Sequence, residues 1–467
     1  MCVKFLKPIY IFLNLWYYNR TKRGCMQLFF DIIKYRGNIP INNGLYGFIY
    51  FFTQIIGILF ILLYFHQFVF VILSSLKAAK IPQKVFKLHK IGFVISARNE
   101  SNVIANLINS IRNNDYPQAM VNIFVVADNC TDNTAQICRD LGCIVVERFD
   151  QTKIGKGYAL NYLFTKLHTE PEYADVIPDA YIIADADNVM TSNYITEMNK
   201  VYDSGYDVVA SYRNTKNFGT NWISAGYGYW FLHESKHLNN ARMIFNSSCF
   251  VMGTGFLISV DTIKEFNNWD FYTLTEDVQF STEYALRGKK VGYCGNAEFF
   301  DEQPEKFKQS WNQRVRWARG YYQVYGLKGK ELIKNMFKNF SCWDTLTSIF
   351  PAMILSLLTV VVLPICSIIA LCVGDYVSAL LAFTSLLANL AMMYVYIFLV
   401  GLTLCVTEWK KIKTTNFKKI LYVFTLPIFM FTYIPISVRA MFGKVGWKPI
   451  IHTSNVKIEE LEKTENK

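Results

Sequence analysis

The 467-residue chain is 52% hydrophobic and only 18% charged, which excludes an ordinary water-soluble protein over much of its length. Its net charge of +12 suits a nucleic acid, an anionic lipid surface or an anionic substrate. The lysine and arginine clusters adjoin long apolar runs, which favours the membrane surface and predicts no nucleic-acid partner. Eleven cysteines without a Cys-x-x-Cys pair or a zinc-type Cys/His spacing predict a reducing compartment for the soluble part.

The chain begins with a basic segment, residues 1–43, which we predict to lie at the membrane interface. Its apolar run 5–18 is interrupted by Lys7 and Pro8 and lacks a small-residue cleavage site, so it does not fit a signal peptide. Residues 44–76 contain no Asp, Glu, Lys or Arg, and they exceed the roughly 20 apolar residues that a transmembrane helix needs. They predict the first membrane span.

Residues 77–303 have a different texture, in which short β-rich runs alternate with helical patterns. Strands are predicted at 91–96, 121–127, 143–147, 180–184 and 207–211, and helices at 101–113, 132–141, 155–168 and 193–202. This alternation predicts an α/β domain with a mixed, mostly parallel sheet, inserted between transmembrane helices. Ligands of such sheets bind at the carboxyl ends of the strands, so polar residues there are candidate site residues.

Residues 304–344 predict amphipathic interfacial helices, and residues 345–438 predict about three transmembrane helices before a tail at 439–467. The uncharged stretches within 345–438 are 345–374, 376–407 and 420–438. Five lysines in 77–90 and five more in 408–419 predict that these loops, and the α/β domain with them, are cytoplasmic. Two arrangements stay open: either 5–18 enters the bilayer, or 420–438, which Pro427 and Pro435 interrupt, does not fully cross.

Two carboxylates follow the first two predicted strands. Glu100 comes just after the first, and Asp128 ends the second beside Asn129, where a turn and then a helix cap at Thr131 or Asp132 are expected. Turn and capping chemistry alone explains each of them taken singly. Side by side, the two strand ends also suit the hydroxyls and base edge of a nucleotide.

Asp185 and Asp187 lie at the end of the strand predicted over 180–184. Residues two apart in an extended chain point to the same side. Two adjacent carboxylates repel each other unless a cation neutralises them, and hard oxygen ligands suit Mg²⁺ or Mn²⁺ bound to a diphosphate. An Asp-x-Asp pair is common in turns, but its position at the end of a strand favours metal and diphosphate binding.

Glu276 and Asp277 open the helical pattern 278–287 after Thr275, a residue typical of helix N-caps. Acidic residues in the first turn are often only structural, because they interact favourably with the helix dipole. The same interaction predicts a low pKa for such a carboxylate. It would then stay ionised, as a base that accepts the proton of an attacking hydroxyl must be.

Gln313, Arg316 and Trp317 share one face of the helix predicted over 304–325, because their spacing is i, i+3 and i+4. Arginine can bind a diphosphate with two parallel hydrogen bonds, and tryptophan offers a flat apolar surface on which a sugar ring can stack. A basic, aromatic helix before a membrane span is also typical of an interfacial anchor, and we expect both roles.

These motifs carry a resemblance to a known family. Asp128, the Asp185-Ala186-Asp187 pair, Thr275-Glu276-Asp277 and Gln313-Arg314-Val315-Arg316-Trp317 occur in the order and rough spacing of the D, DxD, TED and QxxRW motifs. The chain thereby resembles the membrane-bound family 2 glycosyltransferases, which include cellulose, hyaluronan and poly-N-acetylglucosamine synthases. The resemblance implies a GT-A-type nucleotide-sugar-binding domain, a multi-pass location in the cell membrane, and UDP-glucose or UDP-N-acetylglucosamine as the donor.

The resemblance also implies a role for each site residue. Glu100, Asp128, Lys156, Asp185 and Arg316 would bind the donor, Asp185 and Asp187 the Mg²⁺ or Mn²⁺ ion, Gln313, Trp317 and Glu276 the acceptor, and Asp277 would be the catalytic base. Gly253-Thr254-Gly255 stands where the family has its acceptor-side loop, although a plain turn is equally typical. The Cys-containing pattern of cellulose synthases is absent there, and 447–453 only loosely resembles the gating segment of some members.

The function thus implied is inverting transfer of sugar to the growing end of a β-linked polysaccharide, processive and coupled to export. Its expected partners are membrane lipids, a glycan acceptor and export or accessory subunits. The alternatives are a non-processive enzyme with a lipid acceptor and a non-catalytic membrane assembly component, against which the intact motifs argue. His233 and His237 are expected to be core or surface histidines rather than zinc ligands, and Trp222, Tyr227, Tyr229 and Trp230 to be core more than acceptor path.

Overall fold

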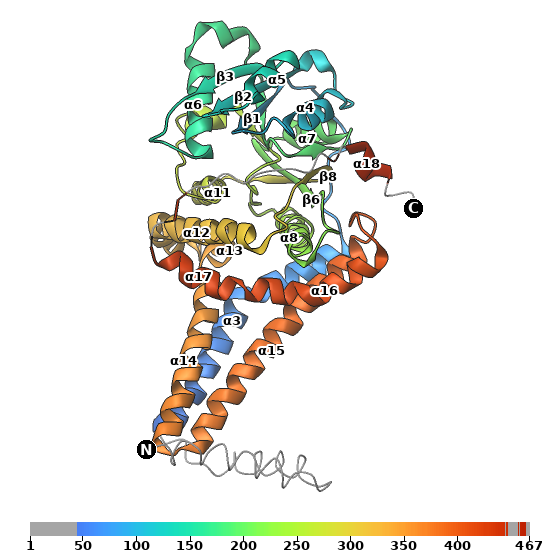
Figure 1. The fold of residues 1–467 in the computed structure, drawn as a ribbon. Helices are drawn as coiled ribbons and strands as arrows, with labels where there is room; N and C mark the ends of the chain where they lie inside the picture. Colours follow the sequence, from blue (N-terminus) through green and yellow to red (C-terminus); the bar gives the residue numbers. More distant parts are fainter. Residues whose placement is uncertain (1–43, 444, 447–455, 457, 464–467) are drawn as a thin grey trace. The chain divides into compact units, whose positions relative to one another are not determined.

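The computed structural model describes residues 44–443, 445–446, 456 and 458–463 (Figure 1). The predicted interfacial segment 1–43 and the segment 447–453 lie outside the described residues. The chain divides into two compact units, Met1–Ile55 with Val361–Leu386 and Ile56–Val360 with Leu387–Lys467. The larger unit contains the whole α/β domain.

An eight-stranded mixed sheet forms the centre of this domain, in the order β3-β2-β1-β4-β7-β6-β8-β5. The strands are β1 Ile91–Ala97, β2 Val121–Asp128, β3 Ile144–Arg148, β4 Ala180–Asp185, β5 Val189–Met190, β6 Val208–Thr215, β7 Phe256–Ser259 and β8 Gly292–Asp301. Strands β1 to β4 pair in parallel, as do β6 and β8, whereas β7 runs antiparallel to both of its neighbours. The prediction of a mixed, mostly parallel sheet is confirmed.

The five predicted strands all form, with ends shifted by a few residues at most except for β6, which continues to Thr215. The four predicted helices between them also form. They are α4 Ile104–Arg112, α5 Thr134–Asp140, α6 Lys156–Thr169 and α7 Tyr194–Asp203, with short 3-10 turns η1 Gln118–Met120 and η2 Pro171–Val176 between elements. Strands β5, β7 and β8 were not predicted, because two of them are short and the third contains Gly295 and Asn296, which are typical of a turn.

Alternate residues of the central strands fill two cores, one on each face of the sheet. On one face, odd-numbered β1 residues such as Phe93 and Ile95 pack with Leu107 of α4 and Met198 of α7. On the other face, Val94 packs with α6 and with helices further along the chain. Because β1 pairs in parallel with both β2 and β4, the carboxyl ends of these three strands lie at one edge of the sheet.

Further helices follow in the second half of the chain. They are α8 Trp222–Leu232, the π-helical segment η3 His233–Asn239, α9 Asn240–Ile244, α10 Val260–Glu265, α11 Glu276–Leu286, α12 Phe307–Asn335 and α13 Phe340–Ile349. Helix α11 packs against α12, and α12 packs against α13. The predicted amphipathic region 304–344 therefore holds one long helix and the first half of a second.

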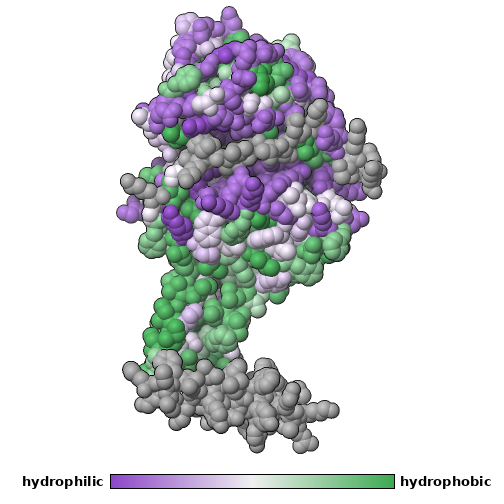
Figure 2. All heavy atoms as spheres, in the orientation of Figure 1, coloured by the Kyte–Doolittle hydropathy of each residue, from purple (hydrophilic) through white to green (hydrophobic). Residues whose placement is uncertain are grey.

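Four helical segments of the described chain are long and apolar enough to cross a membrane. Helices α3 Gly44–Leu76 and α15 Tyr376–Thr407 have the predicted bounds, while the predicted stretch 345–374 divides between α13 and α14 Pro351–Val373. The fourth segment consists of α16 Asn416–Phe431 and α17 Tyr433–Met441. Apolar side chains such as Phe51, Ile61, Ile368 and Val395 are exposed along α3, α14 and α15, whereas hydrophilic residues cover the α/β domain (Figure 2).

Helices α16 and α17 pack against helices of the α/β domain. The Tyr229 hydroxyl of α8 donates to the Lys419 carbonyl at 2.6 Å, and Gly226 of α8 lets Phe429 approach so closely that a Cβ there would lie 2.4 Å from its ring. Ile436 and Ala440 of α17 pack on Val315 of α12. The short helix α18 Ile458–Lys463 then packs on β5 and β8.

Candidate active site

A cavity of about 500 Å³ opens in the larger unit at the carboxyl edge of the sheet. Its walls come from the ends of β1, β2 and β4, from the loop around Gly253, from the first turn of α11 and from one face of α12. All ten residues singled out from the sequence line it: Glu100, Asp128, Lys156, Asp185, Asp187, Glu276, Asp277, Gln313, Arg316 and Trp317. Segments more than 200 residues apart in the chain thus meet at one site.

Asp128 lies at the end of the cavity formed by β1 and β2. It is buried, and it accepts hydrogen bonds from Arg148 Nη1 at 2.6 Å and from Asn129 Nδ2 at 2.9 Å. Burial raises the pKa of Asp128, although the Arg148 guanidinium acts against this shift. Asn129 and Asn99 adopt left-handed backbone angles, φ 54° and 58°, which turn the chain sharply after each strand. The strand end at Asp128 thus serves both as the start of a turn and as part of the cavity wall.

The predicted helix cap after β2 differs in detail. The N-cap position of α5 is Asn133, whose side chain makes no capping bond. Asp132, one residue earlier, accepts the Thr134 N–H at 3.1 Å instead. The free N–H group at the start of α5 is therefore satisfied by Asp132, which precedes the N-cap residue.

Lys156 joins three parts of the site. Its ammonium group pairs with Asp185 and donates to the Gly253 carbonyl at 2.6 Å. Asp185 is held in turn through its backbone N–H, which donates to Thr254 Oγ1 at 2.8 Å. The loop Gly253-Thr254-Gly255 is therefore packed between the DxD pair and Lys156 rather than being a simple surface turn.

The DxD pair fits the hard oxygen ligands of a divalent cation. Asp185 and Asp187 both face the cavity, and Asp187 Oδ2 accepts the Glu302 N–H at 2.9 Å. Nearby Asp301 has a buried Oδ1 without a hydrogen-bond partner among the described residues, and burial together with the charge of Asp187 raises its pKa. Mg²⁺ and Mn²⁺ commonly take one or two carboxylates and complete their coordination with substrate phosphates. No group of three or more His, Cys, Asp or Glu side chains that could hold a metal ion gathers in the described part of the chain.

Asp277 does not have the low pKa that its place in the first turn of α11 predicts. Burial raises the pKa of Asp277, and the Val278 N–H, Lys156 and Arg316 do not outweigh it. Burial and the neighbouring Asp277 charge raise the pKa of Glu276 to about 7. The prediction considered only the helix end, whereas removal from water dominates in this cavity.

Thr275 occupies the N-cap position of α11 as predicted, but its side chain makes no capping bond. Its Oγ1 is buried and has no hydrogen-bond partner among the described residues. Gly253 packs close to Asp277, since a Cβ on Gly253 would lie 3.4 Å from Asp277 Oδ2.

Helix α12 brings Gln313, Arg316 and Trp317 to the cavity from one face, as predicted. Arg316 Nη1 donates to the Leu274 carbonyl at 3.1 Å, which ties the helix to the loop before α11. The Trp317 ring meets Tyr227 and Phe231 edge to face, at centroid distances of 5.7 and 6.1 Å. Its remaining face is available to the cavity.

The aromatic and histidine side chains of α8 and η3 have mainly the expected core role. Tyr227 and Tyr229 are buried, while Trp230 also lines the cavity. His233 and His237 are buried with their Nδ1 atoms 3.0 Å apart, and burial lowers their pKa values to about 3 and about 2. The prediction of core histidines is confirmed.

Four residues that line the cavity were not predicted from the sequence, namely Glu234, Arg242, Asp301 and Tyr321, and neither was Gly320, which packs against Thr275 behind it. Tyr321 carries a usable signal, since it follows Trp317 by four residues on the same helical face. Gly320 lies where α12 crosses Thr275, and a Cβ there would lie 2.4 Å from Thr275 Oγ1. The other three carry no motif and are recognised only from their position.

We expect Gly320→Ala to reduce turnover by about tenfold to a hundredfold, since displacements near 1 Å at a catalytic group can cost about that much. The added methyl group would push α12 away from Thr275 and hence from Asp277. Initial reaction rates from matched amounts of protein measure this. Gly326→Ala on the same helix is the control, because nothing lies within 4 Å of its position. Equal rates for both variants and the wild type would contradict the prediction.

Comparison with known proteins agrees with this geometry. Residues 89–320 match the family described as glycosyltransferase-like family 2. The chain is 25% identical over 279 residues to the probable glycosyltransferase YdaM of Bacillus subtilis, covering 54% of this chain and 62% of that protein. It is 23% identical over 290 residues to the β-monoglucosyldiacylglycerol synthase of a Nostoc species, covering 60% and 57%. It is 23% identical over 252 residues to the poly-β-1,6-N-acetyl-D-glucosamine synthase of Staphylococcus epidermidis, covering 50% and 55%. The chain thus spans less than two thirds of each of these relatives.

The solved structures that match the chain are less similar in sequence. One is the mannosyltransferase PcManGT from Pyrobaculum calidifontis in complex with GDP-Man and Mn²⁺, with a TM-score of 0.48 and 14% identity over 84% of this chain and 99% of that one. Another is S. aureus TarS 1–349 in complex with UDP-GlcNAc, with a TM-score of 0.35 and 14% identity over 62% of this chain and 89% of that one.

Proposed function

We propose that this chain is an inverting membrane glycosyltransferase that extends a β-linked glycan from a UDP-sugar. Residues 89–320, which match glycosyltransferase-like family 2, would form its GT-A-type domain and bind the nucleotide sugar. The observation that carries the proposal is the meeting of all ten predicted residues in one cavity. UDP-glucose and UDP-N-acetylglucosamine are the proposed donors.

In the proposed reaction, an acceptor hydroxyl attacks the anomeric carbon of an α-linked donor while the bond to UDP breaks on the opposite side. Asp277 takes the proton of that hydroxyl, for which its enclosed position beside Gly253 suits it. The raised pKa of Asp277 brings it nearer to the pH at which a carboxylate works well as a base. Inversion of an α-linked donor yields a β-linked product.

Positive groups would hold the donor diphosphate as negative charge develops on it. Lys156 and Arg316 both line the cavity, and their charges act on Asp277 as well, so they lie close to the reacting atoms. Asp185 and Asp187 would hold a Mg²⁺ or Mn²⁺ ion, which supplies positive charge to the diphosphate. Glu100 and Asp128 would bind the nucleoside at the strand ends.

The acceptor end of the proposed site lies beyond Asp277. Trp317 offers a ring face to a sugar, and the buried Gln313 Oε1 has no hydrogen-bond partner among the described residues. From there the cavity continues to Gln67 of α3, Ser348 of α13 and Ile397 of α15. A cavity that runs from the transfer centre to helices of membrane-spanning length supports a processive synthase that passes its product towards the membrane.

A second candidate is the addition of a single sugar to a membrane lipid. It is favoured by the apolar side chains at the far end of the cavity, such as Met393, Ile397, Phe431 and Ile434. The Nostoc relative is named for a product of this kind. The two candidates share donor, base and metal, and they differ in the size and solubility of the product.

We propose a multi-pass protein of the cell membrane with the α/β domain in the cytoplasm. The basic loop 408–419 packs on this domain, where Glu408 accepts the Tyr212 hydroxyl at 2.7 Å and Lys411 pairs with Glu298 at 3.5 Å. Because α16 and α17 pack along α8 and α12, we propose that they stay at the cytoplasmic surface. This choice corresponds to the second of the two arrangements that the sequence leaves open.

The test uses washed membranes that contain the protein, a panel of UDP-sugars, and a readout of UDP release and product size. We expect one donor to give a high-mass polymer that requires Mg²⁺ or Mn²⁺ and disappears with EDTA and with Asp187→Asn. A short, lipid-extractable product would favour the second candidate. If no donor gives turnover that requires both Asp277 and a divalent metal, the proposed transferase is refuted.

A further inference from the structure

One helix of the cavity wall contains an unusual turn. Helix α8 continues through the π-helical segment η3 into α9, so residues 222–244 form one helix with a wider turn in its middle. π-helical turns are rare and are frequent at functional sites. Here Ser235, His237 and Asn239 of η3 are buried in the core, while Glu234 lines the cavity.

Glu234 is a largely buried carboxylate with little to compensate its charge. Its side chain is 20% exposed, and its nearest cation is Arg242, with Oε2 and Nη1 3.8 Å apart. Within the described residues, no protein group donates a hydrogen bond to its carboxylate, which lines the cavity. Burial raises the pKa of Glu234 to about 7, with Arg242 acting in the opposite direction. A buried carboxylate without hydrogen bonds is costly, so donors on a ligand would stabilise it.

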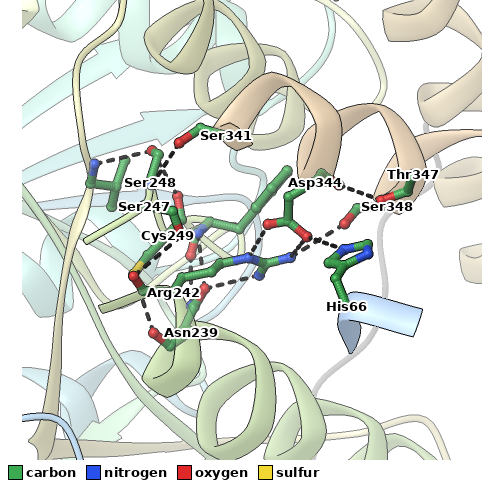
Figure 3. Close-up of polar contacts among 12 residues, drawn as sticks. His66, Asn239, Arg242, Ser247, Ser248, Cys249, Ser341, Asp344, Thr347 and Ser348 are labelled. Atoms are coloured by element: carbon green, nitrogen blue, oxygen red, sulfur yellow. Dashed lines mark hydrogen bonds and ion pairs between the residues drawn. The ribbon is translucent and has the colours of Figure 1, made fainter. Parts of the chain in front are cut away.

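Arg242 is already committed to other partners (Figure 3). Its guanidinium donates to Asp344 at 2.6 Å, to Asn239 Oδ1 at 3.1 Å and to Ser348 Oγ at 3.3 Å. Asp344 also meets His66 Nε2 at 3.1 Å. Arg242 therefore fixes the wall beside Glu234 without satisfying the hydrogen-bonding capacity of Glu234.

Glu234 lines the same cavity as the proposed base Asp277. Tyr321 of α12 lines it as well, and burial followed by the charges of Glu234 and Asp277 raises the pKa of Tyr321. Trp230, Trp317 and Gln67 line the cavity around this region. An acceptor with one hydroxyl at Asp277 would extend past Tyr321 towards Glu234.

We propose that Glu234 is an acceptor-binding residue whose carboxylate accepts hydrogen bonds from hydroxyls of a sugar unit next to the one being extended. This inference rests on the proposed glycosyl transfer and names its acceptor class as a polyhydroxylated glycan. A diacylglycerol offers a single hydroxyl, which Asp277 would engage, and has no further donor for Glu234. The carboxylate thus discriminates between the two acceptors considered above.

The experiment measures kinetics of the purified full-length protein in detergent with Mn²⁺ and the donor found active. The acceptor probes are β-linked trisaccharides of glucose and of N-acetylglucosamine, and diacylglycerol in phosphatidylcholine vesicles. For Glu234→Gln we expect the trisaccharide KM to rise by about tenfold to a hundredfold, in line with loss of hydrogen bonds to a charged group. The donor KM and the acceptor-free release of UDP should stay within about twofold, because donor groups are not altered.

Two further variants separate binding from folding. Glu197→Gln removes another buried carboxylate, which pairs with Lys200 and lies outside the cavity lining, and it should behave as wild type. Glu234→Asp should give an intermediate trisaccharide KM. The inference would be overturned if the trisaccharide KM is unchanged in Glu234→Gln, or if donor affinity falls in parallel. It would also be overturned if the wild-type protein transfers sugar to diacylglycerol and not to the trisaccharides. Loss of all Asp277-dependent turnover in the wild type would instead refute the proposed function.

Discussion

Asp277→Asn is expected to lower turnover by about a thousandfold or more while leaving donor affinity nearly unchanged, because general-base catalysis typically contributes factors of about 10² to 10⁴. Asparagine keeps the size of the side chain but cannot accept the proton of the acceptor hydroxyl. The closeness of Gly253 and the first turn of α11 should hold it in the position of the aspartate. Steady-state rates of UDP release and the inhibition constant for UDP measure the two quantities.

The pH profile gives an independent check of the same residue. Burial raises the pKa of Asp277 above its ordinary value, so kcat/KM should fall as the pH decreases through that raised pKa, above the range of about 4 that is usual for Asp. The acid limb belongs to the Glu276–Asp277 pair, because the two groups titrate together. Glu276→Gln removes one of two adjacent negative charges and should move the limb to lower pH. A limb that stays at the same pH in this variant, or a rate for Asp277→Asn close to wild type, would exclude Asp277 as the base.

The second large effect is expected for stability. Asp344→Asn should destabilise the fold by about 3–5 kcal/mol, as breaking one side of a buried ion pair typically does. Arg242 and Asp344 are both about 1% exposed, with Nε and Oδ2 2.6 Å apart. Burial opposes the ionisation of Asp344, yet Arg242 and His66 hold its pKa below the usual range, so the aspartate is charged and its loss leaves Arg242 uncompensated.

Thermal unfolding in detergent measures this loss, and we expect a decrease of about 5 °C or more. The control is Glu265→Gln, whose pairs with Arg287 and Lys289 are exposed by 35–40% and should contribute little. The double variant Arg242→Met with Asp344→Leu should recover part of the stability, since apolar side chains of similar size often replace a buried pair. If Asp344→Asn unfolds at the same temperature as Glu265→Gln, the ion pair contributes no more than an exposed one.

The fourth apolar stretch shows what a hydropathy pattern leaves open. Residues 420–438 are uncharged and just long enough to span a membrane, yet α16 and α17 divide at Thr432 and pack on α8 and α12. Arg314 of α12 donates to Thr432 Oγ1 at 2.6 Å and lies 4.2 Å from the Phe429 ring centroid. An apolar helical face has the same sequence pattern whether lipid or protein covers it. Length and composition therefore do not distinguish a membrane-spanning helix from a helix packed on the protein.

Local sequence patterns were enough to predict the first four strands, the helices between them and the motif residues, but not β5, β7 and β8. The strand and helix periods depend on residues a few positions apart, and the motifs are short, so β1 to β4, α4 to α7 and the ten site residues could be recognised from local patterns. Three properties became visible only in the folded chain: the raised pKa of Asp277, the position of Glu234 in the cavity wall and the Arg242–Asp344 pair. Burial and charge at a point in space are set by segments far apart in the chain, and no local pattern contains that information.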